Sequence, residues 1–290
     1  MPTDNITAVG GQSGSVYPSI FGSNLWNDVR RGEQAGSYWP GFIGAVAGGV
    51  NKTGVYANGG ERSGIGYKLI NWFGSTYYQL YRVFLNFDLS NIPDNATITD
   101  VKLKIFFREP TTGNVDTDVT PKAMVVAGLN DDALSTGDWV AFVGGDGTSG
   151  STDIHTGVPG PDWDKDGTRP YLDSEATLSS MESYTEMTLN STAILDAQAA
   201  YDNDESFKTV TMDNDHDFED STPSLPGGES LPWHGLVGAD ISTVASSSDG
   251  SANIPILAVT YNVPAGAPAV NQSVIFRSGT STIKGNFKVF

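Results

Sequence analysis

An acidic loop of twelve residues, DWDKDGTRPYLD, holds the side chains with the clearest potential for chemistry in this chain of 290 residues. Carboxylates stand at its first, third and fifth positions and a glycine at its sixth, which lets a tight turn wrap a hard cation such as Ca²⁺. The twelfth position is Asp173 rather than a bidentate Glu, so the loop is no EF-hand between helices. Two interpretations stay open, a Ca²⁺ site in a surface loop and a solvated acidic turn. The ligands of such a site would be Asp162, Asp164, Asp166, Thr168 and Asp173.

A second acidic stretch, DNDHDFED, runs from Asp213 to Asp220. Its alternating carboxylates predict an extended segment. Repulsion among Asp213, Asp215 and Asp217 would be relieved by a bound cation. The alternative is an acidic segment without a ligand.

Catalytic arrangements are missing from the sequence. The histidines, His155, His216 and His234, occur in neither HExxH nor HxH spacing, and the chain has no GxSxG motif and no P-loop. Any fold would bring two of the 34 acidic residues within reach of each other, so carboxylate pairs identify no glycosidase. We therefore expect a protein that is not an enzyme.

Six tryptophans could contribute to a binding surface. Each lies near turn-forming residues, where a flat indole face could stack on a sugar ring, although large sandwiches also close their ends with Trp. A surface for host glycans is therefore an alternative function. The residues are Trp26, Trp39, Trp72, Trp139, Trp163 and Trp233.

The segment from Tyr81 to Phe107 indicates the fold class, and with it the kind of element that positions these side chains. It predicts two β-strands with alternating apolar residues, joined by a corner from Asp88 to Thr99 that is rich in Asn, Asp and Pro. Lys102 and Lys104 give the second strand a solvated face. The predicted core residues are Val83, Leu85, Phe87, Val101, Leu103, Ile105, Ile256 and Val259.

The same segment carries a resemblance to a known family. FDLSNIPDNATITDVKLKI, with Arg82 before it, resembles the signature of DNRLRE-type β-sandwich domains, which are disaggregatase-related and carbohydrate-binding-like. YTEMTLNSTAILDAQAAY and the closing NIPILAVTY are similar to later segments of those domains, and NLWNDVRRGEQAG to the opening of some members. The resemblance covers residues 10–263 and implies a jelly-roll-like antiparallel β-sandwich without catalytic residues.

The rest of the chain divides around this domain. Residues 1–9 form an N-terminal lead, and residues 264–290 a hinge, PAGAPA, followed by a C-terminal β-tail for assembly contacts. One short helix is predicted from Leu189 to Tyr201, capped by Ser191 or Thr192, with Ile194, Leu195 and Ala199 on its buried face. The predicted interface residues of the tail are Val274, Ile275, Phe276, Arg277, Ile283, Lys284, Phe287, Lys288, Val289 and Phe290.

Charge is distributed unevenly along the chain, whose net charge is −18. Between Asn130 and Asp249 there are 24 Asp and Glu residues against three Lys and Arg, whereas residues 263–290 hold three basic residues and no acidic one. Such a surface disfavours nucleic acid, because phosphate contacts need clustered Lys and Arg. No apolar run is long enough to insert into a membrane, and zero cysteines exclude disulfides.

Together these features favour an all-β, non-enzymatic structural subunit on the outside of a large assembly. The sequence shows no apolar leader after Met1, so we expect a bacteriophage virion protein made in the host cytoplasm, as a decoration, fibre or tail-associated subunit. Its partners would be other virion subunits. One alternative is a glycan-binding sandwich of a secreted or cell-surface protein, and another is an extracellular filament subunit that exchanges strands.

Overall fold

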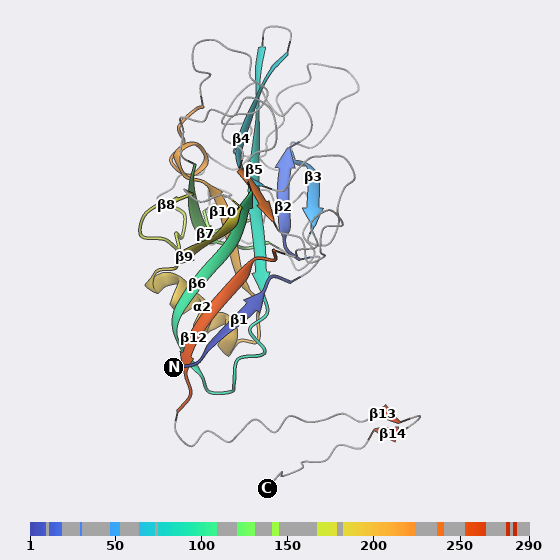
Figure 1. The fold of residues 1–290 in the computed structure, drawn as a ribbon, viewed down its shortest axis with the longest axis vertical. Coiled ribbons are helices and arrows are strands. Elements are labelled where there is room, and N and C mark those ends of the chain that lie inside the picture. The colour runs from blue at the N-terminus through green and yellow to red at the C-terminus, as the bar shows by residue number, and fades with distance from the viewer. Residues whose placement is uncertain are drawn as a thin grey trace.

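The computed structural model is a β-sandwich of antiparallel sheets packed together (Figure 1). The predicted all-β sandwich with one short helix is therefore confirmed. The structure describes residues 1–9, 12–18, 30, 47–52, 64–72, 75–108, 121–130, 141–144, 167–178, 182–223, 237–240, 253–264, 277–278 and 281–282.

The first layer has four strands, in the order β1, β12, β6 and β9. Leu257 and Val259 of β12 point into the core. On the outer face, Lys102 and Lys104 of β6 reach Glu186 of β9 at N–O distances of 2.7 and 3.1 Å. The strand bounds are β1 (Thr3–Thr7), β12 (Ile256–Asn262), β6 (Thr97–Arg108) and β9 (Ser183–Thr188).

The second layer has five strands, in the order β3, β2, β5, β10 and β7, and the two-residue β8 (Ala176–Thr177) pairs with the outer edge of β7. Strand β10 lies between β5 and β7, and its last five residues, from Thr209 to Asp213, are all buried. Neither face of the strand meets solvent there. The bounds are β3 (Ala47–Lys52), β2 (Gly14–Pro18), β5 (Ser75–Phe87), β10 (Phe207–Asp213) and β7 (Lys122–Ala127).

Two further strands connect the layers. The first half of β5 pairs with β4 (Gly64–Trp72), and β11 (Val237–Asp240) pairs with both β4 and β6. Hydrogen bonding therefore continues from one layer to the other at this side of the sandwich.

The two strands and the corner predicted from Tyr81 to Phe107 are β5, β6 and the turn between them. All the core residues predicted on these strands are buried, and Phe84 on the opposite face of β5 is buried too. The prediction was wrong for Ile256, which is only half-buried. Ile256 and Val259 are three residues apart, and side chains of a strand share a face only at even spacing.

Helix α2 (Ser191–Asp202) begins one residue after its cap, Asn190, whose side-chain oxygen accepts hydrogen bonds from Thr192 N and Ala193 N. The predicted cap at Ser191 or Thr192 was therefore wrong, and so was part of the predicted face. Ala193 and Ala197 are buried, whereas Leu195 is 67% exposed and Ala199 is exposed too. Small residues on the inner face let the helix backbone lie close to the sheet, and Ile194 packs at the border of this face.

The two ends of the chain differ in how they join the sandwich. The first nine residues, expected to be a lead, contain β1, which pairs with β12 from Thr3↔Thr260 to Thr7↔Ile256. In the tail, β13 (Arg277–Ser278) and β14 (Ser281–Thr282) pair with each other, and neither pairs with another described strand. Among the described helices, none is long and apolar enough to cross a membrane.

Candidate functional site

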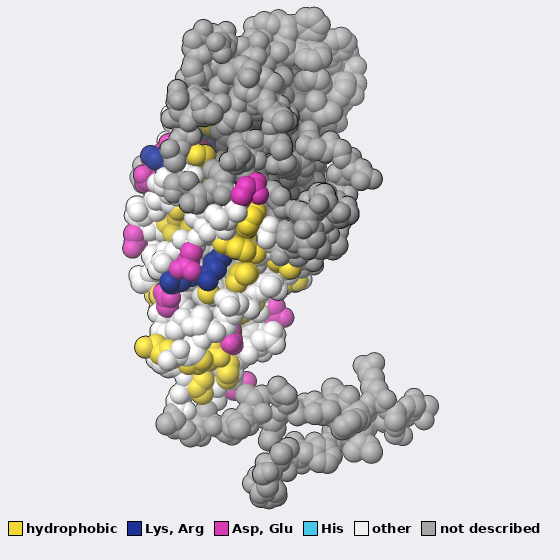
Figure 2. Space-filling view, viewed as in Figure 1, with side chains coloured by type: hydrophobic (Ala, Val, Ile, Leu, Met, Phe, Trp, Pro, Cys, Tyr) yellow, Lys and Arg dark blue, Asp and Glu magenta, His cyan; other side chains and the backbone are white. Residues whose placement is uncertain are grey.

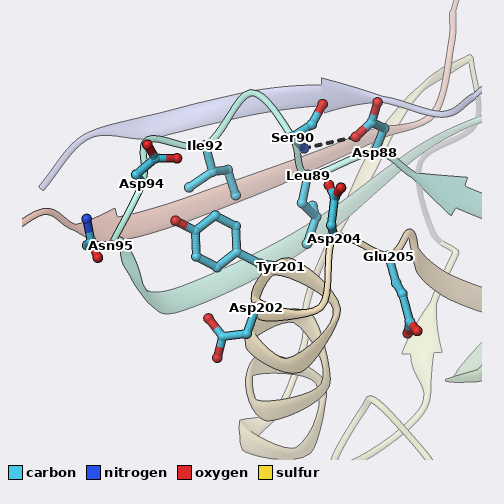
Figure 3. A pocket seen from close by; sticks show the side chains of 10 residues that line it. All are labelled: Asp88, Leu89, Ser90, Ile92, Asp94, Asn95, Tyr201, Asp202, Asp204 and Glu205. Carbon is cyan, nitrogen blue, oxygen red and sulfur yellow. Dashed lines mark hydrogen bonds between the residues drawn. The ribbon is translucent and has the colours of Figure 1, made fainter. Parts of the chain in front are cut away.

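An acidic hollow lies between the corner that joins β5 to β6 and the C-terminal end of α2 (Figure 3). Its volume is about 400 Å³. Leu89, Ile92 and the ring of Tyr201 form its apolar floor, and no Lys or Arg belongs to its described lining. Its five carboxylates are Asp88, Asp94, Asp202, Asp204 and Glu205.

Helix α2 fixes the shape of this hollow by holding the corner. The Tyr201 hydroxyl donates to Pro93 O at 2.7 Å and accepts from Ala96 N at 3.3 Å. Gln198 accepts from Ile98 N at 2.7 Å through its side-chain oxygen. The corner and the helix end therefore form one unit, although they are about a hundred residues apart in sequence.

Two turns with left-handed backbone shape the rim. Asn95 has φ of 63° and Asp204 has φ of 57°. Asn and Asp tolerate this region because their short side chains bond locally. The Asp88 carboxylate accepts from Ser90 N at 2.9 Å, which orders the side of the rim away from Asn95 (Figure 3).

The electrostatics of the hollow favour positive charge. The C-terminal end of a helix carries partial negative charge on its last carbonyls, and here the carboxylates of Asp202, Asp204 and Glu205 add to it. Oxygen acceptors of this kind bind ammonium and guanidinium groups or the hydroxyls of a sugar.

A longer groove of about 700 Å³ adjoins this hollow and shares Asp88 with it. One wall is the edge strand β1 with the residues that follow it, and the other includes Asp88 and Asn91 of the β5–β6 corner. The end of the sandwich thus carries a continuous acidic surface made by β1, the corner and α2.

Among the described residues, the largest fully buried side chain is Arg82 of β5, which pairs with the fully buried Asp217. Its Nε and Nη2 donate to the two carboxylate oxygens of Asp217, each at 2.7 Å. The guanidinium carbon lies 5.1 Å from the centre of the Phe142 ring. This two-pronged geometry neutralises both charges inside the core.

Arg30, which is also buried, contacts the same Asp217. Its Nε and Nη2 donate to the backbone oxygen of Asp217 at 3.0 and 2.8 Å, and Nη1 lies 2.5 Å from an oxygen of Asp220. Burial lowers the pKa of Arg30, and the charges of Asp217 and Asp220 oppose that effect. Arg82 in turn donates to Arg30 O at 3.1 Å, so the cluster ties together three distant segments.

The second acidic stretch is a turn of π-helix, η3 (Asn214–Phe218), rather than the expected extended segment. Asp213 caps this turn by accepting from His216 N at 2.7 Å, Asp215 lies 3.6 Å from the Lys122 ammonium, and Asp217 pairs with Arg82. Each carboxylate predicted to share a cation therefore has a partner within the chain.

Asp213 and His216 have shifted pKa values because both are largely enclosed. Burial raises the pKa of Asp213 to about 7, and the Asp217 and Asp215 charges add to the rise. Burial lowers the pKa of His216, whose Nδ1 donates to Ser221 O at 2.6 Å and whose ring meets Tyr67 edge-on at 4.4 Å. Both shifts come from packing against the core.

The predicted calcium loop is described only in its second half, since Asp162, Asp164 and Asp166 lie outside the described residues. Thr168 is half-buried and Asp173 exposed. Between them, Tyr171 N donates to Val125 O at 2.7 Å, and the Arg169 guanidinium donates twice to Asp196 of α2, each time at 2.6 Å. This half of the loop is therefore anchored on β7 and α2. In the described part of the chain, no three or more acidic or histidine side chains are grouped as metal ligands would be.

Most of the other predicted site residues also fall outside the description. Of the interface residues, Arg277 lies in β13, and Val274, Ile275, Phe276, Ile283, Lys284, Phe287, Lys288, Val289 and Phe290 are outside the described residues. The same holds for the tryptophans, except that the backbone of Trp72 ends β4.

The pairing of Arg82 with Asp217 was not predicted from the sequence. A usable signal was present, because Arg82 stands between apolar neighbours, Leu80 and Tyr81 before it and Val83 to Leu85 after it, and Arg is almost never fully buried without a partner. The partner itself could not be read from sequence, since 135 positions separate the two residues.

No protein-family model matches the chain, and no curated protein matches its sequence. The structure defines the class, an antiparallel β-sandwich with a buried Arg–Asp pair and an acidic surface at one end.

Proposed function

We propose that this chain is a non-enzymatic structural subunit displayed on the outside of a large assembly, in particular a bacteriophage virion, as a decoration, fibre or tail-associated protein. The fold proposed for it is the DNRLRE-like sandwich. One observation carries the proposal. The chain leaves the sandwich at the end of β12, beside the edge strand β1, and continues into a basic tail whose strands β13 and β14 join no other described strand.

The surrounding surface supports this proposal. A two-stranded ribbon is marginally stable alone, so a β-prone tail gains by packing on a neighbour. Met1 and Val263 are exposed apolar residues next to β1 and β12, where the tail begins. The broad face of β6 and β9 instead carries mixed acidic and basic side chains, as a solvent-facing surface does (Figure 2).

The test compares the full chain with a truncation at Ala265. Light scattering and native mass spectrometry should find the full chain in assemblies and the truncated chain as a folded monomer with the same circular dichroism spectrum. The proposal is wrong if the truncated chain assembles normally, and the tail belongs to the domain's own core if that chain does not fold.

The acidic hollow supports a second candidate, binding of a surface glycan. Carboxylates accept hydrogen bonds from sugar hydroxyls, and the Tyr201 ring offers an apolar face. Glycan-array binding that is lost in Asp204→Asn but kept in Asp173→Asn would support it. Equal binding by these two variants would exclude the hollow.

A further inference from the structure

Among the described residues, no strand pairs with the outer edge of β1 from Thr3 to Asn5, whereas beyond Thr7 the chain meets β5, because Ala8 bridges Phe87 and Val9 N donates to Asn86 O. Ala8 N donates to Pro255 O, and Tyr261 N donates to Pro2 O, so the even-numbered residues direct their backbone groups toward β12. By the alternation of an antiparallel ladder, Thr3, Asn5 and Thr7 direct theirs away from it. Among the residues that the structure describes, no strand pairs with this side of β1.

A groove follows this open edge. It is the 700 Å³ groove described above, which is lined by residues 4–9 on one side and by Asp88 and Asn91 of the β5–β6 corner on the other. Asn5 and Thr7 are exposed, whereas Ile6 is buried, so the outer face of β1 meets solvent and its inner face meets the core. A strand laid in the groove would therefore extend the first layer and cover the side of the core.

The groove and the tail have opposite charge. Asp4 and Asp88 lie in the groove, and Asp94 and Asp204 lie in the adjoining hollow. Part of the acceptor capacity is used within the chain, since Asp4 accepts from the Tyr261 hydroxyl at 3.0 Å. Each ionised carboxylate can nevertheless accept further bonds.

The last stretch of the sequence has the pattern of a strand with two different faces. Ile283, Phe287 and Val289 alternate with Lys284 and Lys288, and no acidic residue occurs after Asn262. Such a strand would place apolar side chains on the core side and ammonium groups near the solvent edge, within reach of the acidic rim.

We propose that the groove along β1 receives residues 281–290 of a second copy of this chain as an added β-strand. This inference rests on the proposed function, because it names the surface through which the subunits assemble. A second copy is the occupant because, among the described residues of one chain, Ser281–Thr282 pairs with Arg277–Ser278 and no strand pairs with the outer side of β1. A reciprocal exchange between two copies would satisfy both edges at once.

Two full-length variants test the accepting edge, β1, and the donated strand, residues 281–290, separately. Asn5→Pro removes an N–H that points into the groove, and proline is tolerated on an edge strand, so this variant should fold but accept no strand. Ile283→Pro/Phe287→Pro should fold but donate none. Asn5→Thr, which keeps the N–H and suits a strand, is the control.

The measurement is native mass spectrometry and light scattering of each variant alone and of the two proline variants mixed. Each proline variant alone should raise the apparent dissociation constant of self-assembly by about tenfold or more, whereas Asn5→Thr should not. The mixture should form a one-to-one complex, because one variant still donates and the other still accepts.

The outcomes also separate this inference from the proposed function. If Asn5→Pro assembles as well as the parent chain, or if the mixture forms no complex, the groove does not receive the tail of a second copy, although assembly itself stands. If the parent chain is monomeric at all concentrations and with candidate assembly partners, both fail. Loss of thermal stability in both proline variants of a monomeric chain would show that the tail occupies its own edge, which also overturns the inference.

Discussion

At the scale of single residues, the pairing of Arg82 with Asp217 is the most consequential feature of the interior. Arg82→Met would leave the Asp217 carboxylate buried with Arg30, 3.9 Å from Oδ1, as its remaining cation among the described residues. We expect the free energy of unfolding to fall by about 3–5 kcal/mol in urea titrations. The double variant Arg82→Met/Asp217→Leu should lose less stability than the two single variants together, because it removes both charges and leaves no unpaired partner of the pair in the core.

Lys104→Met is the matched control for this change. Lys104 makes a surface ion pair with Glu186, and exposed pairs contribute about 0–1 kcal/mol. Equal loss of stability in Lys104→Met and Arg82→Met would contradict a structural role of the buried pair.

Asp213 predicts a pH dependence of stability. Its folded pKa is about 7, above the usual value of 3.8, so the folded state favours the protonated carboxyl. Its contribution is fully present below about pH 4 and is lost as pH rises through 7. Asp213→Asn imitates the protonated form and can still accept from His216 N, so it should be more stable than the parent by roughly 2–4 kcal/mol at pH 8, and similar to it at pH 4.

Thermal unfolding of both proteins from pH 4 to pH 8 checks this expectation. His216 titrates in the same window with a lowered pKa, so its contribution is lost as pH falls below 6.5. Only the difference between the two proteins therefore isolates Asp213. A difference that does not grow with pH would count against the raised pKa.

At the scale of elements, the cap of α2 supports the acidic hollow, because this helix holds the β5–β6 corner. Asn190→Ala removes the oxygen that accepts from Thr192 N and Ala193 N and should lower the free energy of unfolding by about 1 kcal/mol. Asn190→Asp keeps the cap and loses only the donation to Pro170 O. It should retain most of the stability, and equal losses in chemical denaturation would show that the Pro170 contact matters more.

The acidic loop makes a separate prediction at this scale. If Asp162, Asp164 and Asp166 bind Ca²⁺ with Thr168 and Asp173, millimolar Ca²⁺ should release heat in calorimetry and raise the melting temperature. The response should disappear in Asp164→Asn/Asp166→Asn, and Asp94→Asn/Asp204→Asn in the hollow is the control. No heat and an unchanged melting temperature in the parent chain would identify a solvated turn.

At the scale of the whole molecule, assembly should depend more on apolar burial than on charge. Exposed ion pairs contribute about 0–1 kcal/mol each, whereas burying a large apolar side chain contributes about 1.5–3 kcal/mol. Ile283→Ala/Phe287→Ala should therefore weaken assembly more than Lys284→Ala/Lys288→Ala in light scattering on dilution. The reverse order, together with loss of assembly at high salt, would point to an electrostatic contact.

The sequence by itself determined the local features of this protein. The alternation in β5 and β6, the corner between them and the existence of one helix follow from side-chain periodicity and turn residues, which act over a few positions. The uneven charge was equally visible. The predicted cap and buried face of α2 were wrong in detail. The helix lies close to the sheet, so the small side chains of Ala193 and Ala197 face it, and Leu195 is exposed although it is more apolar.

Only the tertiary structure decided which distant residues meet. The pairing of β1 with β12 joins residues 257 positions apart, and Asp217 meets Arg82 and Arg30 across three segments. The acidic hollow exists because Tyr201 and Gln198 hold a corner that lies far away in sequence. Such contacts depend on how the strands order themselves in the sheets, and local periodicity fixes each strand's buried face but leaves its neighbours undetermined.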